Sequence, residues 1–161
     1  MVHRSKQIAA AMFALLFTTI SVAASKGAEL KEVHDDKYKP GQVWSYRTRA
    51  NEQESTLTIL RVDETPDKKR IVHIRVDHVQ LTNCKGGQAP DTFEHMPFSR
   101  EALNEGVLKV IRTGPVPDFR SGYSEWRAGW DAGKAGYYTI SVALALDVAQ
   151  KTFDQGVGCS N

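Results

Sequence analysis

Residues 70–81 read RIVHIRVDHVQL and form the longest strand that the sequence predicts. The first half places β-branched residues on one face: Val72, Ile74 and Val76. The opposite face carries polar residues: His73, Arg75 and Asp77. Beyond this point the apolar positions Val79 and Leu81 have the opposite parity. Since side chains alternate strictly along a strand, we expect a bulge or a break near Asp77–His78.

Two further strands are expected before this segment. Residues 43–49, VWSYRTR, alternate with aromatic residues on one face, which is typical of a half-buried strand. Residues 56–62, TLTILRV, are rich in β-branched and aliphatic residues, and their apolar parity changes between Ile59 and Leu60. The turn residues at 65–68 connect this strand to the next. Together the three strands predict a curved antiparallel meander.

After a loop at 83–91 the apolar spacing becomes helical. Ser99 is placed to cap a helix that runs to about Arg112, and aromatic residues at i, i+3 and i+7 predict a second helix over 122–134. A third helix is expected over 141–153, although residues 138–146 also alternate and could form a fourth strand. Strands followed by helices indicate an α+β fold, in which two to three helices pack on one face of the meander.

The N-terminal residues have the pattern of an export signal. Arg4 and Lys6 are followed by an uncharged apolar run over 8–22, and small residues occupy 22–24. This pattern predicts a cleaved signal peptide over residues 1–24, with an uncleaved membrane anchor as the alternative. We expect residues 25–39 to be a polar arm or linker, 40–155 to be a single α+β domain, and 156–161 to be a tail.

Cleavage would also change the net charge. The chain has 21 Lys and Arg residues against 19 Asp and Glu residues, and the excess is Arg4 and Lys6 within the signal peptide. A charge-balanced body has no overall field that attracts nucleic acid. The sequence therefore predicts a periplasmic or secreted protein that binds no nucleic acid and, after cleavage, no membrane.

Two cysteines, Cys84 and Cys159, would meet an oxidising compartment after export. A bridge between them would close a loop of about 75 residues and stabilise the fold by roughly 4–5 kcal/mol in the loop-entropy model. The alternatives are two free thiols or intermolecular pairing. A disulfide would also hold the C-terminal tail.

Four arginines are the candidate binding residues. They lie on the three predicted strands: Arg47, Arg49, Arg61 and Arg75. If their faces coincide, an exposed sheet face carries several guanidinium groups, which bind carboxylates and phosphates in bidentate fashion. Such a face would fit an acidic protein or an anionic glycan. The alternative is a solvated sheet face that nearby carboxylates balance.

The sequence contains no GxSxG, HExxH, GxxxxGK[ST] or paired CxxC motif, so we predict no catalytic residue, metal site or cofactor. Three histidines offer an alternative: His73, His78 and His95. A bulge could bring His73 and His78 to one face, where they could serve a hydrolase, with or without zinc. The aromatic stripe of the second helix, at 123, 126 and 130, is either core or a platform that stacks on sugars.

The segments PGQVWSYRTR (40–49) and DAGKAG (131–136) resemble parts of small uncharacterised bacterial proteins, as does HMPFS at 95–99. The resemblance covers residues 40–153 and implies a bacterial origin and one compact domain, with no activity attached. The sequence thus predicts an exported, non-catalytic binding module, such as an inhibitor, an immunity-type protein or an envelope accessory protein. The alternative is a small periplasmic hydrolase.

Overall fold

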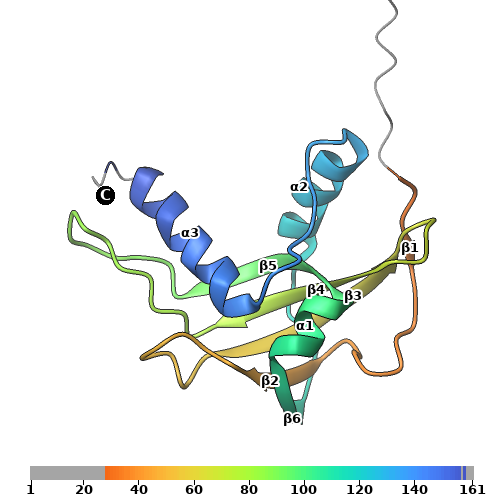
Figure 1. Ribbon diagram of the computed structural model, residues 1–161, viewed down its shortest axis with the longest axis horizontal. Coiled ribbons are helices and arrows are strands. Elements are labelled where there is room, and N and C mark those ends of the chain that lie inside the picture. The colour runs from red at the N-terminus through yellow and green to blue at the C-terminus, as the bar shows by residue number, and fades with distance from the viewer. Residues whose placement is uncertain (1–27, 157, 159–161) are drawn as a thin grey trace, which may run out of the picture.

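The computed structural model describes residues 28–156 and residue 158, and its architecture is α+β (Figure 1). The predicted signal peptide lies outside the described residues, as does most of the predicted tail. The strands are β1 (Lys31–Glu32), β2 (Gln42–Tyr46), β3 (Thr56–Glu64), β4 (Arg70–Asp77), β5 (Thr92–Ser99) and β6 (Val107–Thr113). The helices are α1 (Arg100–Gly106), α2 (Arg120–Asp131) and α3 (Val142–Gly156).

The described strands form one open antiparallel sheet in the order β5-β4-β3-β2-β6, and β1 pairs with the end of β3. The predicted antiparallel meander is confirmed for β2, β3 and β4. Both predicted irregularities are also present. β4 ends at Asp77, and His78 follows with a left-handed φ of 58°. The register of β3 against β4 shifts between Ile59 and Arg61, which is the expected bulge.

The expected helix from Ser99 to Arg112 is wrong in its second half. Ser99 does cap a helix, because its hydroxyl accepts a hydrogen bond from the Ala102 amide at 3.1 Å. However, α1 ends at Gly106, and the chain continues as β6 along the edge of β2. Residues 107–113, VLKVIRT, are rich in β-branched residues, and Gly106 is a poor helix former. Pairing with β2 therefore outweighs the helical spacing, and with β5 and β1 the sheet has six strands rather than three or four.

The main core lies between one face of the sheet and the helices α1 and α3. Its fully buried side chains include the following residues: Val72, Ile74, Phe98, Leu103 and Leu146. The β4 residues among them belong to the face that the sequence predicts to be apolar. The third helix is confirmed as α3, where the Ser141 hydroxyl accepts a hydrogen bond from the Leu144 amide at 3.3 Å.

The segment expected to be a polar arm contributes to the interior in its described part. Tyr38 is fully buried within the core cluster, and Leu30 is buried as well. The Tyr38 hydroxyl donates to Asn104 Oδ1 of α1 at 2.9 Å. Asp35 is buried and binds both Arg70 and Arg100 through Oδ2, at 2.8 and 2.9 Å. These contacts join the segment to β4 and α1, which are distant in sequence.

The helices do not all pack on one face of the sheet, so that part of the prediction is corrected. His73 in β4 points away from the face of Val72 and Ile74, since neighbouring side chains alternate. The ring of His73 contacts Tyr123 and Trp126 of α2. Helix α2 therefore covers the opposite face, over β4 and β5.

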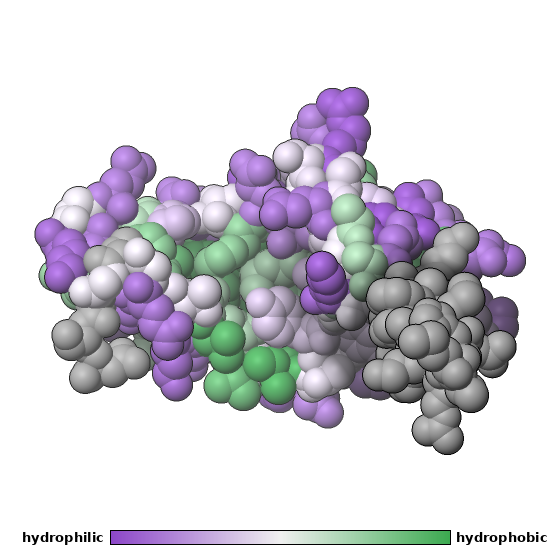
Figure 2. Space-filling view, turned by 90° about the horizontal axis from the view of Figure 1, so that it is seen from above, coloured by the Kyte–Doolittle hydropathy of each residue, from purple (hydrophilic) through white to green (hydrophobic). Residues whose placement is uncertain are grey.

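The surface seen from above has hydrophilic residues at its ends and hydrophobic residues gathered between them (Figure 2). Among the described residues, the exposed large hydrophobic side chains include three on β6: Leu108, Val110 and Ile111. Two others lie on α3: Leu144 and Val148. The apolar surface of β6 is therefore a feature to explain.

Candidate functional site

A hydrogen-bonded pair of histidines lies under helix α2. His73 of β4 and His95 of β5 share the sheet face that α2 covers, and their rings stack at 5.1 Å between centroids with 16° between planes. The Nδ1 atom of His73 is 2.9 Å from Nε2 of His95. His73 is fully buried, whereas His95 is half-buried. The pairing of β4 with β5 thus brings together two residues that are 22 positions apart.

Asp63 of β3 anchors this pair. Its Oδ2 atom lies 3.1 Å from His73 Nε2 and accepts a hydrogen bond from the Tyr123 hydroxyl at 2.7 Å. Its Oδ1 atom accepts from Arg61 Nε at 2.8 Å. Burial would raise the pKa of Asp63, but the hydrogen bonds from His73 and Tyr123 outweigh burial and hold the pKa below its ordinary value. Asp63 is therefore a fully buried carboxylate with three donors.

The carboxylate fixes the protons of the two rings. Because Asp63 only accepts hydrogen bonds, Nε2 of His73 carries a proton and its Nδ1 accepts one from Nε2 of His95. In this assignment Nδ1 of His95 keeps its lone pair. Burial lowers the pKa of His73, and burial together with the neighbouring ring lowers the pKa of His95 to about 4. Both rings are neutral at neutral pH.

Helix α2 packs aromatic side chains against the histidine pair. The rings of Tyr123 and Trp126 meet His73 edge to face, at 5.1 and 4.7 Å between centroids. A Cβ atom on Gly122 would lie 2.8 Å from the Cβ atom of His95. Only glycine at this position lets the helix approach the strand so closely. The aromatic stripe that the sequence indicates is therefore packed against the histidines over part of its length.

A cavity of about 370 Å³ opens beside this cluster, and we call it the aromatic cleft. Its lining residues come from β5, α2 and the connector to α3: Pro97, Trp126, Ala135, Gly136, Tyr137 and Tyr138. The Trp126 indole N–H donates to the Gly136 carbonyl at 2.7 Å, which fixes the indole ring. Tyr137 stacks on Trp130 at 6.2 Å. The fixed indole of Trp126 and the stacked ring of Tyr137 give this recess aromatic lining, which is typical of small-ligand sites.

The four predicted arginines do not form one face. Arg61 and Arg75 share a face of β3 and β4, where they bind Asp63 and Asp77, at 2.8 and 2.7 Å. By contrast, Arg49 lies in the loop after β2 and binds Glu52 and, at 3.4 Å, Asp147 of α3. The remaining residue, Arg47, donates to the Glu105 carbonyl at 2.7 Å. The structure therefore brings two of the four together and gives three of them carboxylate partners.

The three histidines of the hydrolase alternative are likewise divided. His73 and His95 are in contact, whereas His78 lies exposed beyond the end of β4. In the part of the chain that the structure describes, no group of three His, Cys, Asp or Glu residues is placed to hold a metal ion. The Cys84–Cys159 disulfide stays a prediction, because Cys159 lies outside the described residues.

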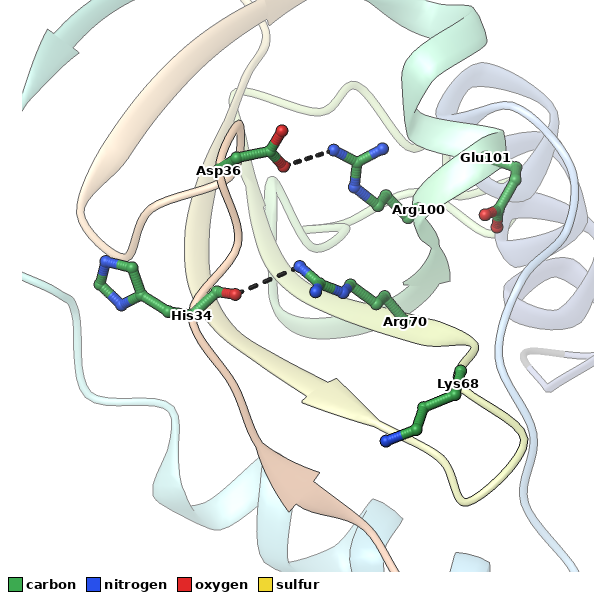
Figure 3. Close-up of a pocket in the computed structure, with 6 residues that line it drawn as sticks. All are labelled: His34, Asp36, Lys68, Arg70, Arg100 and Glu101. Carbon is green, nitrogen blue, oxygen red and sulfur yellow. Dashed lines mark hydrogen bonds and ion pairs between the residues drawn. The ribbon is translucent and has the colours of Figure 1, made fainter.

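A second, polar cavity of about 470 Å³ lies where the N-terminal segment meets β4 and α1 (Figure 3). It is lined by charged and polar residues: His34, Asp36, Lys68, Arg70, Arg100 and Glu101. Arg70 and Arg100 both bind the buried Asp35 behind it. Burial would raise the pKa of Asp35, but the hydrogen bonds it receives keep the pKa well below its ordinary range. Both arginines already have a carboxylate partner in Asp35. The cavity therefore lies at the contact that holds the N-terminal segment against β4 and α1, and we call this contact the Asp35 joint.

The sequence alone points to the histidines but not to the residues that organise them. Asp63 follows Arg61 by two positions and pairs with Ile71 across the strands, so a correct register of β3 and β4 would have placed it beside His73. The helix that covers the pair follows β6, which the spacing did not predict. The distant contacts of α2 therefore required the three-dimensional structure.

The chain matches no protein-family model, and no curated protein or solved structure is significantly similar to it. Among the described residues, no helix combines the length and apolar character needed to cross a bilayer. The aromatic cleft and the histidine pair are therefore the structural features that bear on function.

Proposed function

We propose that the protein is an exported, non-catalytic binding module whose ligand site is the aromatic cleft. An inhibitor, an immunity-type protein or an envelope accessory protein would have this design. The observation that carries the proposal is a recess of about 370 Å³ with aromatic walls, which is within the size range of small-ligand sites. The fixed indole of Trp126 supports it, since a wall that is already ordered loses little entropy on binding.

The ligand class that fits these walls best is a sugar ring of a glycan. Tryptophan and tyrosine rings present flat apolar faces, and tyrosine also offers a polar group at its tip. A pyranose ring has an apolar C–H face and a polar rim, which matches such walls. Lining residues Trp126 and Tyr137 both contact Trp130, at 5.5 and 6.2 Å between ring centroids, whereas the ring of the third aromatic lining residue, Tyr138, packs on Phe98 of the core.

The neutral histidine pair supports a binding role. Trp126 is both a wall of the cleft and a cover for His73, at 4.7 Å between ring centroids. Because the pKa of His95 is lowered to about 4, this imidazole is a weak base at neutral pH. The pair then acts as a rigid, uncharged support for the cleft wall.

Binding is tested by titrating the protein while following tryptophan fluorescence. The probes are oligomers of N-acetylglucosamine, which are neutral, and a soluble polyuronate, which is anionic. Tyr137→Ala should weaken binding about tenfold, and Tyr137→Phe should retain most of it, because the ring supplies the contact. Phe153→Ala, on the distant helix α3, is the matched control. Absence of binding to both probes, or equal binding by Tyr137→Ala and the native protein, would overturn the proposal.

The chain Asp63–His73–His95 favours a second candidate, a hydrolase in which His95 Nδ1 acts as general base. A carboxylate that orients an imidazole is a common device of acid–base catalysis. The test is hydrolysis of chromogenic esters, phosphodiesters and glycosides. His95→Gln should abolish turnover, and His78→Gln should not. No turnover of these substrates by the native protein would remove this candidate.

Export and the disulfide are tested together on protein from a periplasmic extract. The expected mature N-terminus is Ser25, and protein denatured without reductant should show no free thiol at Cys84 or Cys159. Detection of Met1 in the soluble cytosolic fraction would contradict export. Two free thiols would contradict the bridge alone.

A further inference from the structure

The two edges of the sheet differ. At the C-terminal end of β5 the chain covers its own edge, because Tyr138 forms a parallel bridge with Phe98. The Tyr138 amide donates to the Pro97 carbonyl at 2.9 Å, and the Ser99 amide donates to the Tyr138 carbonyl at 2.8 Å. At the opposite edge, β6 pairs with β2 on one side, and no strand among the described residues pairs with its other side.

This open edge is apolar. Leu108 is 57% exposed, Ile111 46% and Val110 39%. A native edge strand usually avoids such surface or is covered, because its free main-chain groups are a template for another strand. Exposed apolar side chains beside free main-chain groups are also the features that strand-addition sites use.

The edge is basic as well. The β2–β6 ribbon, residues 42–47 and 107–113, contains Arg47, Lys109 and Arg112 and no acidic residue. Seven of the nine described arginines form ion pairs with carboxylates: Arg49, Arg61, Arg70, Arg75, Arg100, Arg120 and Arg127. The two described arginines without a carboxylate partner in the structure, Arg47 and Arg112, both belong to this ribbon. Among the described residues, the positive charge of this ribbon therefore has no carboxylate partner in an ion pair.

The positive charges of β6 favour an acidic strand over a second copy of β6 as the segment that pairs with this edge. In an antiparallel pair of two β6 strands, Lys109 and Arg112 of one copy would lie near those of the other, and opposed like charges destabilise a strand pair. An extended segment that alternates acidic and β-branched residues would satisfy the cations, the apolar side chains and the main chain together.

We propose that β6 is a strand-addition site for an acidic, extended segment of a partner protein. This site is separate from the aromatic cleft and does not depend on the function proposed for it. The added strand would extend the sheet beyond β6, with its main-chain groups bonded to the free edge. Its carboxylates would contact Lys109 and Arg112.

The test uses the purified full chain and a fluorescein-labelled seven-residue peptide, EVETEVE, followed by fluorescence anisotropy. Two control peptides are tested beside it. One has Lys in place of Glu, and the other is EVETEVE with an N-methylated main chain. Only EVETEVE should bind, because the Lys peptide reverses the charge and N-methylation removes main-chain donors. Equal binding of the N-methylated peptide would show plain electrostatic attraction and overturn strand addition.

The matched variants have the same change in net charge. K109E/R112E should weaken binding of EVETEVE at least about tenfold and favour the Lys peptide, whereas K85E/K151E, with both changes away from the ribbon, should change affinity by less than about twofold. Equal losses in the two variants would refute the site.

Two results would assign the edge to a different occupant and refute the proposal. One is binding to vesicles of anionic phospholipid, lost in K109E/R112E, without binding to EVETEVE. The other is dimerisation in sedimentation velocity that the substitution Val110→Lys abolishes.

Discussion

Acidification should destabilise the protein through the buried histidine pair. In the unfolded chain a histidine has a pKa near 6.5, whereas burial and the neighbouring ring lower the pKa of His95 to about 4 in the folded protein. Between these values the unfolded state binds more protons, so the free energy of unfolding falls as the pH falls. The lowered pKa of His73 acts in the same direction.

The size of the effect follows from the two pKa values. Since a tenfold change in proton affinity corresponds to 1.36 kcal/mol, His95 alone should cost about 2–3 kcal/mol between pH 7 and pH 4.5. The geometry gives a second reason for the loss. The bond between His73 Nδ1 and His95 Nε2 needs one donor and one acceptor, so it fails when both rings are protonated.

The assay is urea unfolding followed by tryptophan fluorescence at a series of pH values from 7 to 4.5. His95→Gln is the informative variant, because a glutamine amide can still donate to His73 but does not titrate. The slope of its unfolding free energy against pH should be smaller than that of the native protein by about one proton. His78→Gln, at an exposed position, should leave the slope unchanged. A His95→Gln protein with the native slope would refute this reasoning.

Two further substitutions test the packing. Gly41 has a φ of +86°, and a Cβ there would overlap the Gly114 carbonyl oxygen, so Gly41→Ala should lower the unfolding free energy by about 2 kcal/mol or more in chemical denaturation. A Cβ at Gly106, at the end of α1, would enter open space, so Gly106→Ala should leave the unfolding free energy unchanged or raise it. A large fall in the unfolding free energy of Gly106→Ala would contradict this reasoning. Leu146→Ala should lower the unfolding free energy by about 2–5 kcal/mol, since the Leu146 side chain is fully buried. Leu144→Ala, at a half-exposed position of the same helix, should change it by no more than about 1 kcal/mol. Similar thermal midpoints for the two leucine variants would show that α3 does not close the core.

Local alternation predicts the centre of the sheet well. The change of parity along β4 identified the break that the structure places at His78, and the same pattern identified the bulge of β3 near Leu60. Both features follow from a side-chain period of two, which holds for any strand with one buried face. The cap at Ser99 was also predictable, because its hydroxyl acts within one helical turn.

The errors all concern contacts between residues that are distant in sequence. Residues 107–113 have both helical spacing and β-branched residues, and the free edge of β2 decides between them. Tyr38 lies in a segment without periodicity, so its burial depends on α1 and the sheet. The candidate site could not be predicted from the sequence for the same reason, since the contact between Asp63 and His73 depends on the register of two strands. Neither propensity nor spacing contains this information.

The joint at Asp35 also constrains the order of folding. Its carboxylate requires Arg70 and Arg100, which come 35 and 65 residues later in the chain. Closing loops of that length is slow compared with forming a hairpin, because the entropy of the intervening chain is lost before the contact forms. The first described residues of the polypeptide should therefore dock last, after β4 and α1 have come together. If the chain crosses a membrane with its N-terminus first, Asp35 would have neither arginine partner in place until Arg70 and Arg100 had also crossed.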